Sequence, residues 1–94
     1  MLLQALQILK IALQISVDTY DEYLTGLLVL AKANIETEGI VLVENCTADI
    51  YLVEMYAEWL YRVRRETDGP GMPRALRWAL NNRLFSQKAQ EAAQ

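Results

Sequence analysis

The chain has 94 residues with one cysteine, no histidine and a formal net charge of −3. A chain of this length forms one small domain, and its composition excludes an intrachain disulfide and the usual zinc-ligand patterns. Hydrophobic residues make up 53% of the sequence, slightly more than in a typical soluble domain. We therefore expect a partner subunit to cover part of its apolar surface.

The first predicted helix spans residues 2–15, where leucines recur at helical spacing. Glutamines and Lys10 interrupt its apolar run, so it lacks the roughly 18 continuous apolar residues of a membrane span. It also lacks the charged start of a signal peptide. These features indicate a soluble cytoplasmic protein that does not bind a membrane, with Cys46 as a buried or half-buried thiol in a reducing compartment.

The second predicted helix spans residues 19–38, with Asp18 or Thr19 as its N-cap and Gly39 directly after its end. Besides its main apolar face it has a second apolar group that includes Tyr23 and Leu30. A helix that is apolar on two sides is either central or shared with a neighbouring chain. Residues 40–43 favour β-structure, but the sequence has no second such run to pair with them, so we expect an extended connector.

The third predicted helix spans residues 48–66, with Thr47 as its N-cap and with Glu54, Glu58 and Arg62 on a solvated face. The Gly69–Gly71 turn ends it, and a fourth helix spans residues 73–86. Residues 87–94 are expected to fray or to become ordered on a partner. The sequence thus predicts an all-α bundle of about four helices in a single domain, residues 1–94. Its predicted core consists of Leu24, Leu28, Ala31, Ile35, Val53, Tyr56, Ala57, Leu60, Leu76 and Leu80.

The fourth helix has two unlike apolar faces. At about 100° per residue its leucines fall on one side, and Trp78 and Phe85 fall well away from them. One face suits the helix's own domain, and the other suits a partner. The predicted interface consists of Arg74, Arg77, Trp78, Asn81 and Phe85 on this helix, with Tyr23 and Leu30 on the second helix.

Charge is unevenly distributed along the chain. Residues 1–61 carry two basic and nine acidic residues, a net −7, and residues 62–94 carry seven basic and three acidic residues, a net +4. This pattern favours head-to-tail association of identical subunits, although charged surface residues also cluster without such a role. The basic residues Arg62, Arg64, Arg65 and Arg83 are predicted to face a channel or a partner, or to form a DNA-binding patch.

The sequence offers no pattern that supports catalysis. It has no histidine to activate Cys46, and the turn at Gly69–Gly71 lacks the lysine and the preceding strand of a phosphate-binding loop. Close acidic pairs such as Glu54 and Glu58 are more often solvated helix faces than acid–base machinery. We therefore expect no enzymatic activity, no cofactor and no metal.

Residues 56–62 (YAEWLYR) and 72–84 (MPRALRWALNNRL) resemble the small head–tail connector proteins, also called DNA-packaging proteins, of long-tailed bacteriophages. The earlier helical pattern is similar too, although the first helix is unusually apolar. The resemblance implies a helical virion protein without enzymatic activity that forms a homo-oligomeric ring, dodecameric like the portal, at the head–tail junction. It also implies assembly in the host cytoplasm.

In such a junction the ring would extend the DNA channel without sequence-specific DNA binding. Its partners would be the portal protein and a downstream head-completion or tail-joining protein. Two alternatives remain open from the sequence. One is a small helical DNA-binding or regulatory protein that uses the arginine cluster, and the other is a helical adaptor unrelated to phage.

Overall fold

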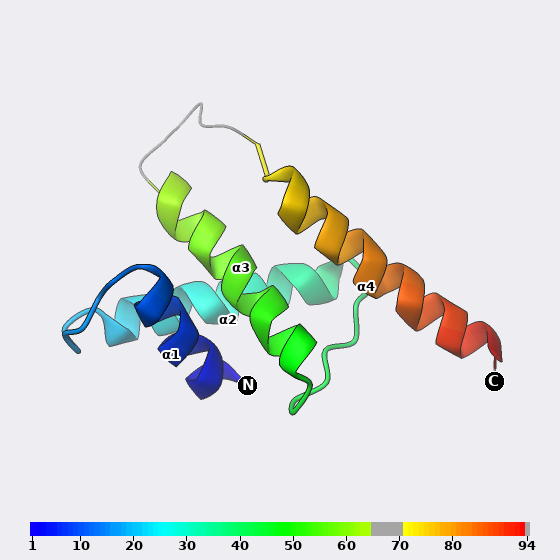
Figure 1. Ribbon diagram of the computed structural model, residues 1–94, viewed down its shortest axis with the longest axis horizontal. Coiled ribbons are helices and arrows are strands. Elements are labelled where there is room, and N and C mark those ends of the chain that lie inside the picture. The colour runs from blue at the N-terminus through cyan, green and yellow to red at the C-terminus, as the bar shows by residue number, and fades with distance from the viewer. Residues whose placement is uncertain (65–70, 94) are drawn as a thin grey trace.

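Four α-helices make up the fold, as the computed structural model shows for residues 1–64 and 71–93 (Figure 1). They are α1 (Leu2–Ala12), α2 (Asp21–Thr37), α3 (Thr47–Val63) and α4 (Arg74–Ala93). No strand occurs among the described residues, and residues 40–43 form an extended connector between α2 and α3. The predicted all-α bundle and the predicted connector are both confirmed.

The central helix is α3, which packs against each of the other three helices. Its position explains why α3 buries side chains on several sides, including Leu52, Val53 and Ala57. Helix α1 packs on α2 and α3 of its own chain through Met1 and Leu9, both of which are buried. Nine of the ten predicted core residues are buried, and the tenth, Leu60, is only partly buried.

Helix α1 ends three residues earlier than predicted, and its end has a local cause. Gln14 adopts a left-handed backbone conformation with φ 58°. Its N–H donates to the Ile11 carbonyl, and the Ile15 N–H donates to the Lys10 carbonyl. These two bonds form a Schellman motif, which satisfies carbonyls that the helix end leaves free. This end was not predicted because glycine, not glutamine, usually occupies the left-handed position after a helix.

The predicted side-chain caps of α2 and α3 are wrong. Tyr20 and Cys46 hold the two N-cap positions, and neither cap makes a side-chain hydrogen bond. The Asp18 carboxylate instead accepts a hydrogen bond from Lys10 at 2.8 Å, and Thr47 is already the first residue of α3. The end of α2 is as predicted, because Gly39 follows it with a φ of 99° that favours glycine.

Two other helix ends differ from the predicted boundaries. Helix α3 ends at Val63, with Arg64 as its C-cap, and the predicted end at residues 65–66 lies outside the described residues, as do residues 69–70 of the predicted stop. Helix α4 begins at Arg74, one residue after Pro73, and continues to Ala93. Residues 87–93 therefore form the last part of α4.

Helix α4 carries the C-terminus beyond the other helices, so the molecule is elongated (Figure 1). Its principal dimensions are 46 × 32 × 18 Å. The alanines and glutamines of the projecting part are good helix formers, which accounts for a helix that few tertiary contacts support. No helix of the described chain is both long and apolar enough to cross a membrane.

Candidate interaction surfaces

The outer face of α4 exposes two aromatic side chains, as the sequence predicted. Trp78 is 67% exposed and Phe85 is 75% exposed, whereas Leu76 and Leu80 on the opposite side are buried. Trp78 also lines a shallow apolar groove of about 280 Å³ between α3 and α4, together with Tyr51 and Met55. The helix thus uses one face for its own core and leaves the other uncovered.

The outer face of α2 forms a second uncovered apolar surface. Tyr23 is 47% exposed, Leu30 is 48% exposed and Val29 lies exposed beside them. The small residues Gly26 and Ala33 lie on the same face, and no other atom lies within 4 Å of a Cβ placed at Gly26. Helix α2 is therefore not central within the subunit, because its second apolar face is uncovered.

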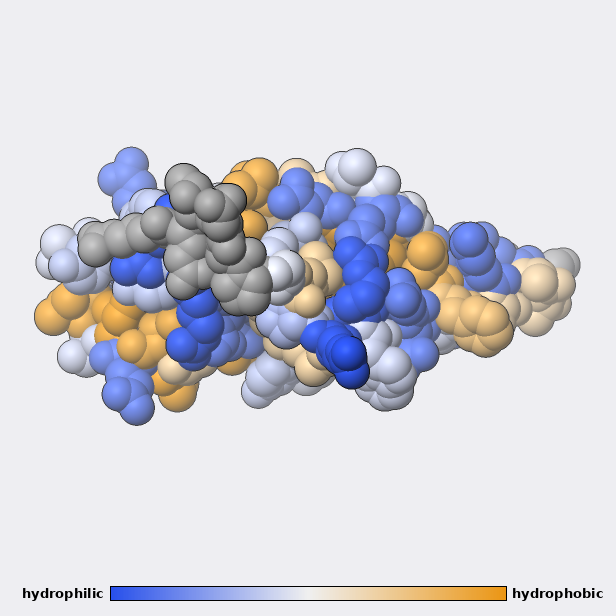
Figure 2. Space-filling view, turned by 90° about the horizontal axis from the view of Figure 1, so that it is seen from above, coloured by the Kyte–Doolittle hydropathy of each residue, from blue (hydrophilic) through white to orange (hydrophobic). Residues whose placement is uncertain are grey.

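Hydrophobic surface is not restricted to one end of the molecule. Figure 2, which looks down on the molecule from above, shows hydrophobic residues at the bundle end and along the projecting helix, separated by strongly hydrophilic ones. The larger exposed apolar side chains include Leu3 and Ile11 on α1 as well as those on α2 and α4. Exposed apolar surface of this extent on a small domain is typical of a protein that binds partners.

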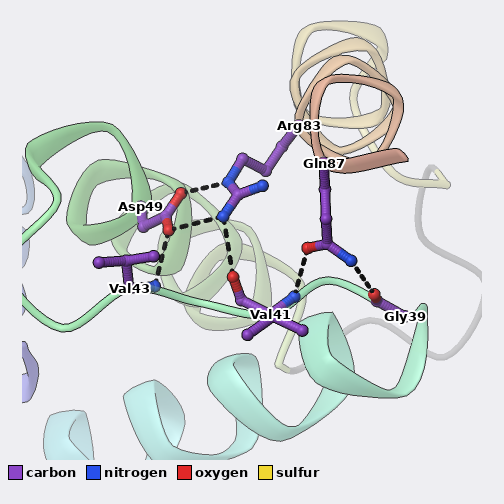
Figure 3. A network of polar contacts seen from close by, with 6 residues as sticks. All are labelled: Gly39, Val41, Val43, Asp49, Arg83 and Gln87. Atoms are coloured by element: carbon purple, nitrogen blue, oxygen red, sulfur yellow. Dashed lines mark hydrogen bonds and ion pairs between the residues drawn. The ribbon is translucent and has the colours of Figure 1, made fainter. Parts of the chain in front are cut away.

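A network of polar contacts fastens α4 to the connector and to α3 (Figure 3). The Arg83 guanidinium donates to both carboxylate oxygens of Asp49, at 2.7 and 3.2 Å, and to the Val41 carbonyl at 2.8 Å. Asp49 is fully buried and also accepts the Val43 N–H at 2.8 Å. The Gln87 amide donates to the Gly39 carbonyl and accepts the Val41 N–H.

This network corrects the role expected for Arg83. Its guanidinium is committed to Asp49, which raises the pKa of Arg83 above its usual value, so it is not free to face a channel or a partner. The network also explains why the connector is extended without being a strand, because α4 side chains satisfy its backbone groups. The sequence did not predict this pair, because Asp49 and Arg83 are 34 residues apart along the chain.

Two other arginines of the basic C-terminal third, residues 62–94, also have partners within the chain. Arg77 donates to both carboxylate oxygens of Glu38, at 2.7 and 3.2 Å, and Arg62 pairs at 2.6 Å with Glu58, which lies four residues earlier on α3. Arg64 lies over the Tyr61 ring at 3.8 Å. Arg65 lies outside the described residues. Part of the charge asymmetry along the sequence is thus neutralised inside one subunit.

The predicted interface residues do not form one continuous site. Arg74, Trp78, Asn81 and Phe85 lie exposed on α4, and Tyr23 and Leu30 lie exposed on the separate helix α2. Arg77 is also exposed but is bound to Glu38 at the edge of the bundle. The structure therefore divides the predicted interface into two surfaces, one on each helix.

Glu54 departs from the expected solvated face, because its side chain is buried. Burial raises the pKa of Glu54 to about 7, and the nearby Glu58 carboxylate adds to the effect. One Glu54 oxygen has no hydrogen-bond partner among the described residues. A single buried carboxyl without a nucleophile or a substrate cavity beside it gives no support for catalysis, and no group of three or more potential metal ligands occurs in the described part of the chain.

Comparison of the chain with known protein families, curated proteins and solved structures found no match. The interpretation of these surfaces therefore rests on their geometry, their chemistry and the residues discussed above.

Proposed function

We propose that this protein is a structural subunit of the head–tail connector of a long-tailed bacteriophage and that it assembles as a ring beneath the portal. The observation that carries the proposal is the presence of two separate uncovered apolar faces on one small domain, on α2 and α4. A closed ring needs two different contact surfaces on every subunit, because each copy binds one neighbour on each side.

The segments that resemble connector proteins lie on α3 and at the start of α4. Residues 72–84 include the start of α4 with its exposed Trp78, and residues 56–62 belong to α3, against which α4 packs. In the assembled particle the ring would extend the DNA channel, with the portal protein on one side and a tail-joining protein on the other. The projecting end of α4 offers a platform for one of these partners.

The intramolecular ion pairs weaken the alternative of a DNA-binding protein. Arg77 and Arg83 are bound to Glu38 and Asp49, so the basic cluster offers fewer free cations than its sequence suggests. DNA affinity depends on cations that reach phosphates and release counterions. The remaining exposed cations suit a channel that encloses DNA without reading its sequence.

The proposal is tested by measuring the mass of the purified protein in solution over a range of concentrations and by imaging the particles in negative stain. We expect a concentration-dependent shift from monomer to closed rings, promoted by the portal. A protein that stays monomeric at all concentrations and with the portal, but binds duplex DNA with strong salt dependence, would contradict it.

A further inference from the structure

The outer face of α4 follows a continuous heptad pattern. Six of its exposed residues are spaced by alternating steps of three and four, which places them on one stripe opposite the leucines. Along this stripe the two large side chains, Trp78 and Phe85, are separated and flanked by small or polar side chains. We call this stripe the α4 seam; it consists of Ala75, Trp78, Asn82, Phe85, Ala89 and Ala92.

The outer face of α2 carries a matching stripe with the same steps of three and four. It consists of Tyr23, Gly26, Leu30 and Ala33, all of which are exposed, and we call it the α2 seam. Large and small residues alternate here as well. The open space around Gly26 leaves room for a side chain of another helix to approach the backbone.

The charges beside the two seams are complementary in sign and in spacing. Glu22 and Glu36 flank the α2 seam, and Arg74 and Lys88 flank the α4 seam. The members of each pair are 14 residues apart, which corresponds to about 21 Å along a helix. None of the four takes part in an ion pair within residues 1–64 and 71–93.

We propose that the α4 seam of one copy packs antiparallel on the α2 seam of the next copy. Each of the four charged residues lies directly before the first position of a heptad (position a) and therefore occupies position g. Two g positions face each other only when the paired helices run in opposite directions. In a parallel pair, each charged residue at position g would instead face position e of the partner helix, and the e positions beside both seams are uncharged. Charge complementarity therefore selects both the occupant, a second copy of this chain, and the orientation.

The antiparallel arrangement also fixes a register in which large side chains of one seam face large side chains of the other, and small residues face small or polar ones. With Arg74 beside Glu36 and Lys88 beside Glu22 of the neighbour, Trp78 packs on Leu30 and Phe85 packs on Tyr23. Between these large layers Asn82 faces Gly26, and beyond them Ala75 faces Ala33. The aromatic pair supplies the type of buried anchor that dominates protein interfaces.

The pairing uses different surfaces on the two copies, so it propagates from head to tail and closes into a ring where the rotation permits. It rests on the proposed function, because it specifies how the subunits of the ring contact one another. Self-pairing of two α4 seams is disfavoured, since an antiparallel pair would bring Arg74 and Lys88 of one copy against the same cations of the other.

Charge reversal with mixing tests the pairing. One variant carries Arg74→Glu with Lys88→Glu, and the other carries Glu22→Lys with Glu36→Lys. In each variant alone, the contact between two copies brings like charges together. We therefore expect assembly of each variant alone to weaken at least tenfold at low salt. Mixed one to one, the variants regain complementary contacts by alternating, and assembly returns. The control, Gln4→Glu with Gln7→Glu, adds negative charge at two exposed positions of α1 that lie outside both seams and assembles normally.

Cross-linking provides a second measurement that does not depend on charge. In a Cys46→Ser background, Gly26→Cys with Asn82→Cys places thiols in the same proposed layer, and oxidation should give a ladder of covalent oligomers. Asn82→Cys alone should give none. Covalent dimers from Asn82→Cys alone would show α4 self-pairing and would overturn the proposal.

The outcomes separate this inference from the proposed function. If wild-type rings form but folded variants do not regain assembly on mixing, the α4–α2 pairing is wrong and the ring remains. If the charge-reversed variants each assemble as well as wild type, the pairing is also wrong. If wild type forms no ring alone or with the portal, the proposed function itself fails.

Discussion

Replacing Arg83 with methionine should destabilise the fold far more than its surface position suggests. The substitution keeps much of the side chain's length but removes the charge that is bound to Asp49. The Asp49 carboxylate is fully buried, and without Arg83 its one remaining hydrogen bond within residues 1–64 and 71–93 comes from the Val43 N–H at 2.8 Å. Breaking a buried ion pair from one side typically costs about 3–5 kcal/mol.

We expect Arg83→Met to lower the free energy of unfolding by about 3 kcal/mol, the lower end of that range, because Arg83 is itself partly exposed. With a denaturant dependence of about 1 kcal/mol per molar urea for a domain of this size, the unfolding midpoint should fall by about 3 M. Circular dichroism at two protein concentrations measures this and separates unfolding from subunit dissociation.

The matched control is Arg62→Met, which removes an arginine from the exposed pair with Glu58. Such helical pairs contribute about 0.3–0.5 kcal/mol, so this control should shift the urea midpoint by less than about 0.5 M. Arg83→Lys should fall between the two, since lysine keeps the charge but cannot donate through a planar fork. Equal stability of Arg83→Met and Arg62→Met would refute the proposed contribution of the network.

Other predictions follow from the core, the buried carboxyl and the α4 face. Leu80→Ala should cost about 2–5 kcal/mol because Leu80 is fully buried, and Leu60→Ala should cost less because Leu60 is only partly buried; urea unfolding compares them. Glu54 has a folded-state pKa of about 7, above its ordinary 4.5, so wild type should lose stability as pH rises from about 4.5 to 7. Glu54→Gln should remove that loss, with a gain of about 1–2 kcal/mol at pH 8 after allowance for solvent screening, and none at pH 4. Thermal unfolding across this pH range checks it, and a variant with the same pH dependence as wild type would contradict it. Trp78→Ala with Phe85→Ala should keep the helical content and the urea midpoint while abolishing assembly; unfolding of the double variant would instead place these residues in the subunit core.

Periodicity made most of the fold predictable. The leucines of α4 and the apolar faces of α2 and α3 recur at helical spacing, and tertiary packing follows that spacing closely. The exposed positions of Trp78 and Phe85 were predicted for the same reason, because two residues seven apart must share one side of a helix. The turn at Gly39 was predictable because glycine is common directly after the end of a helix, where the backbone often adopts a left-handed conformation.

The contacts between distant segments were not predictable from the sequence. Asp49 and Arg83 meet only because α4 crosses the connector, and no local pattern links them. Glu54 has the spacing of a solvated residue, yet the packing of other helices around α3 buries it. The end of α1 depends on a left-handed glutamine, which local sequence preferences disfavour. The ion pairs of Arg77 with Glu38 and of Arg83 with Asp49 have the same tertiary origin.

The central claim is that two different faces of one helical subunit build a ring on the portal. Class averages of negatively stained portal rings, mixed with wild type or with the Trp78→Ala, Phe85→Ala double variant, test it most directly. The account predicts an added layer with the symmetry of the portal for wild type and bare portal rings for the folded double variant. Bare portal rings with wild type, or an added layer of equal occupancy with the double variant, would contradict it.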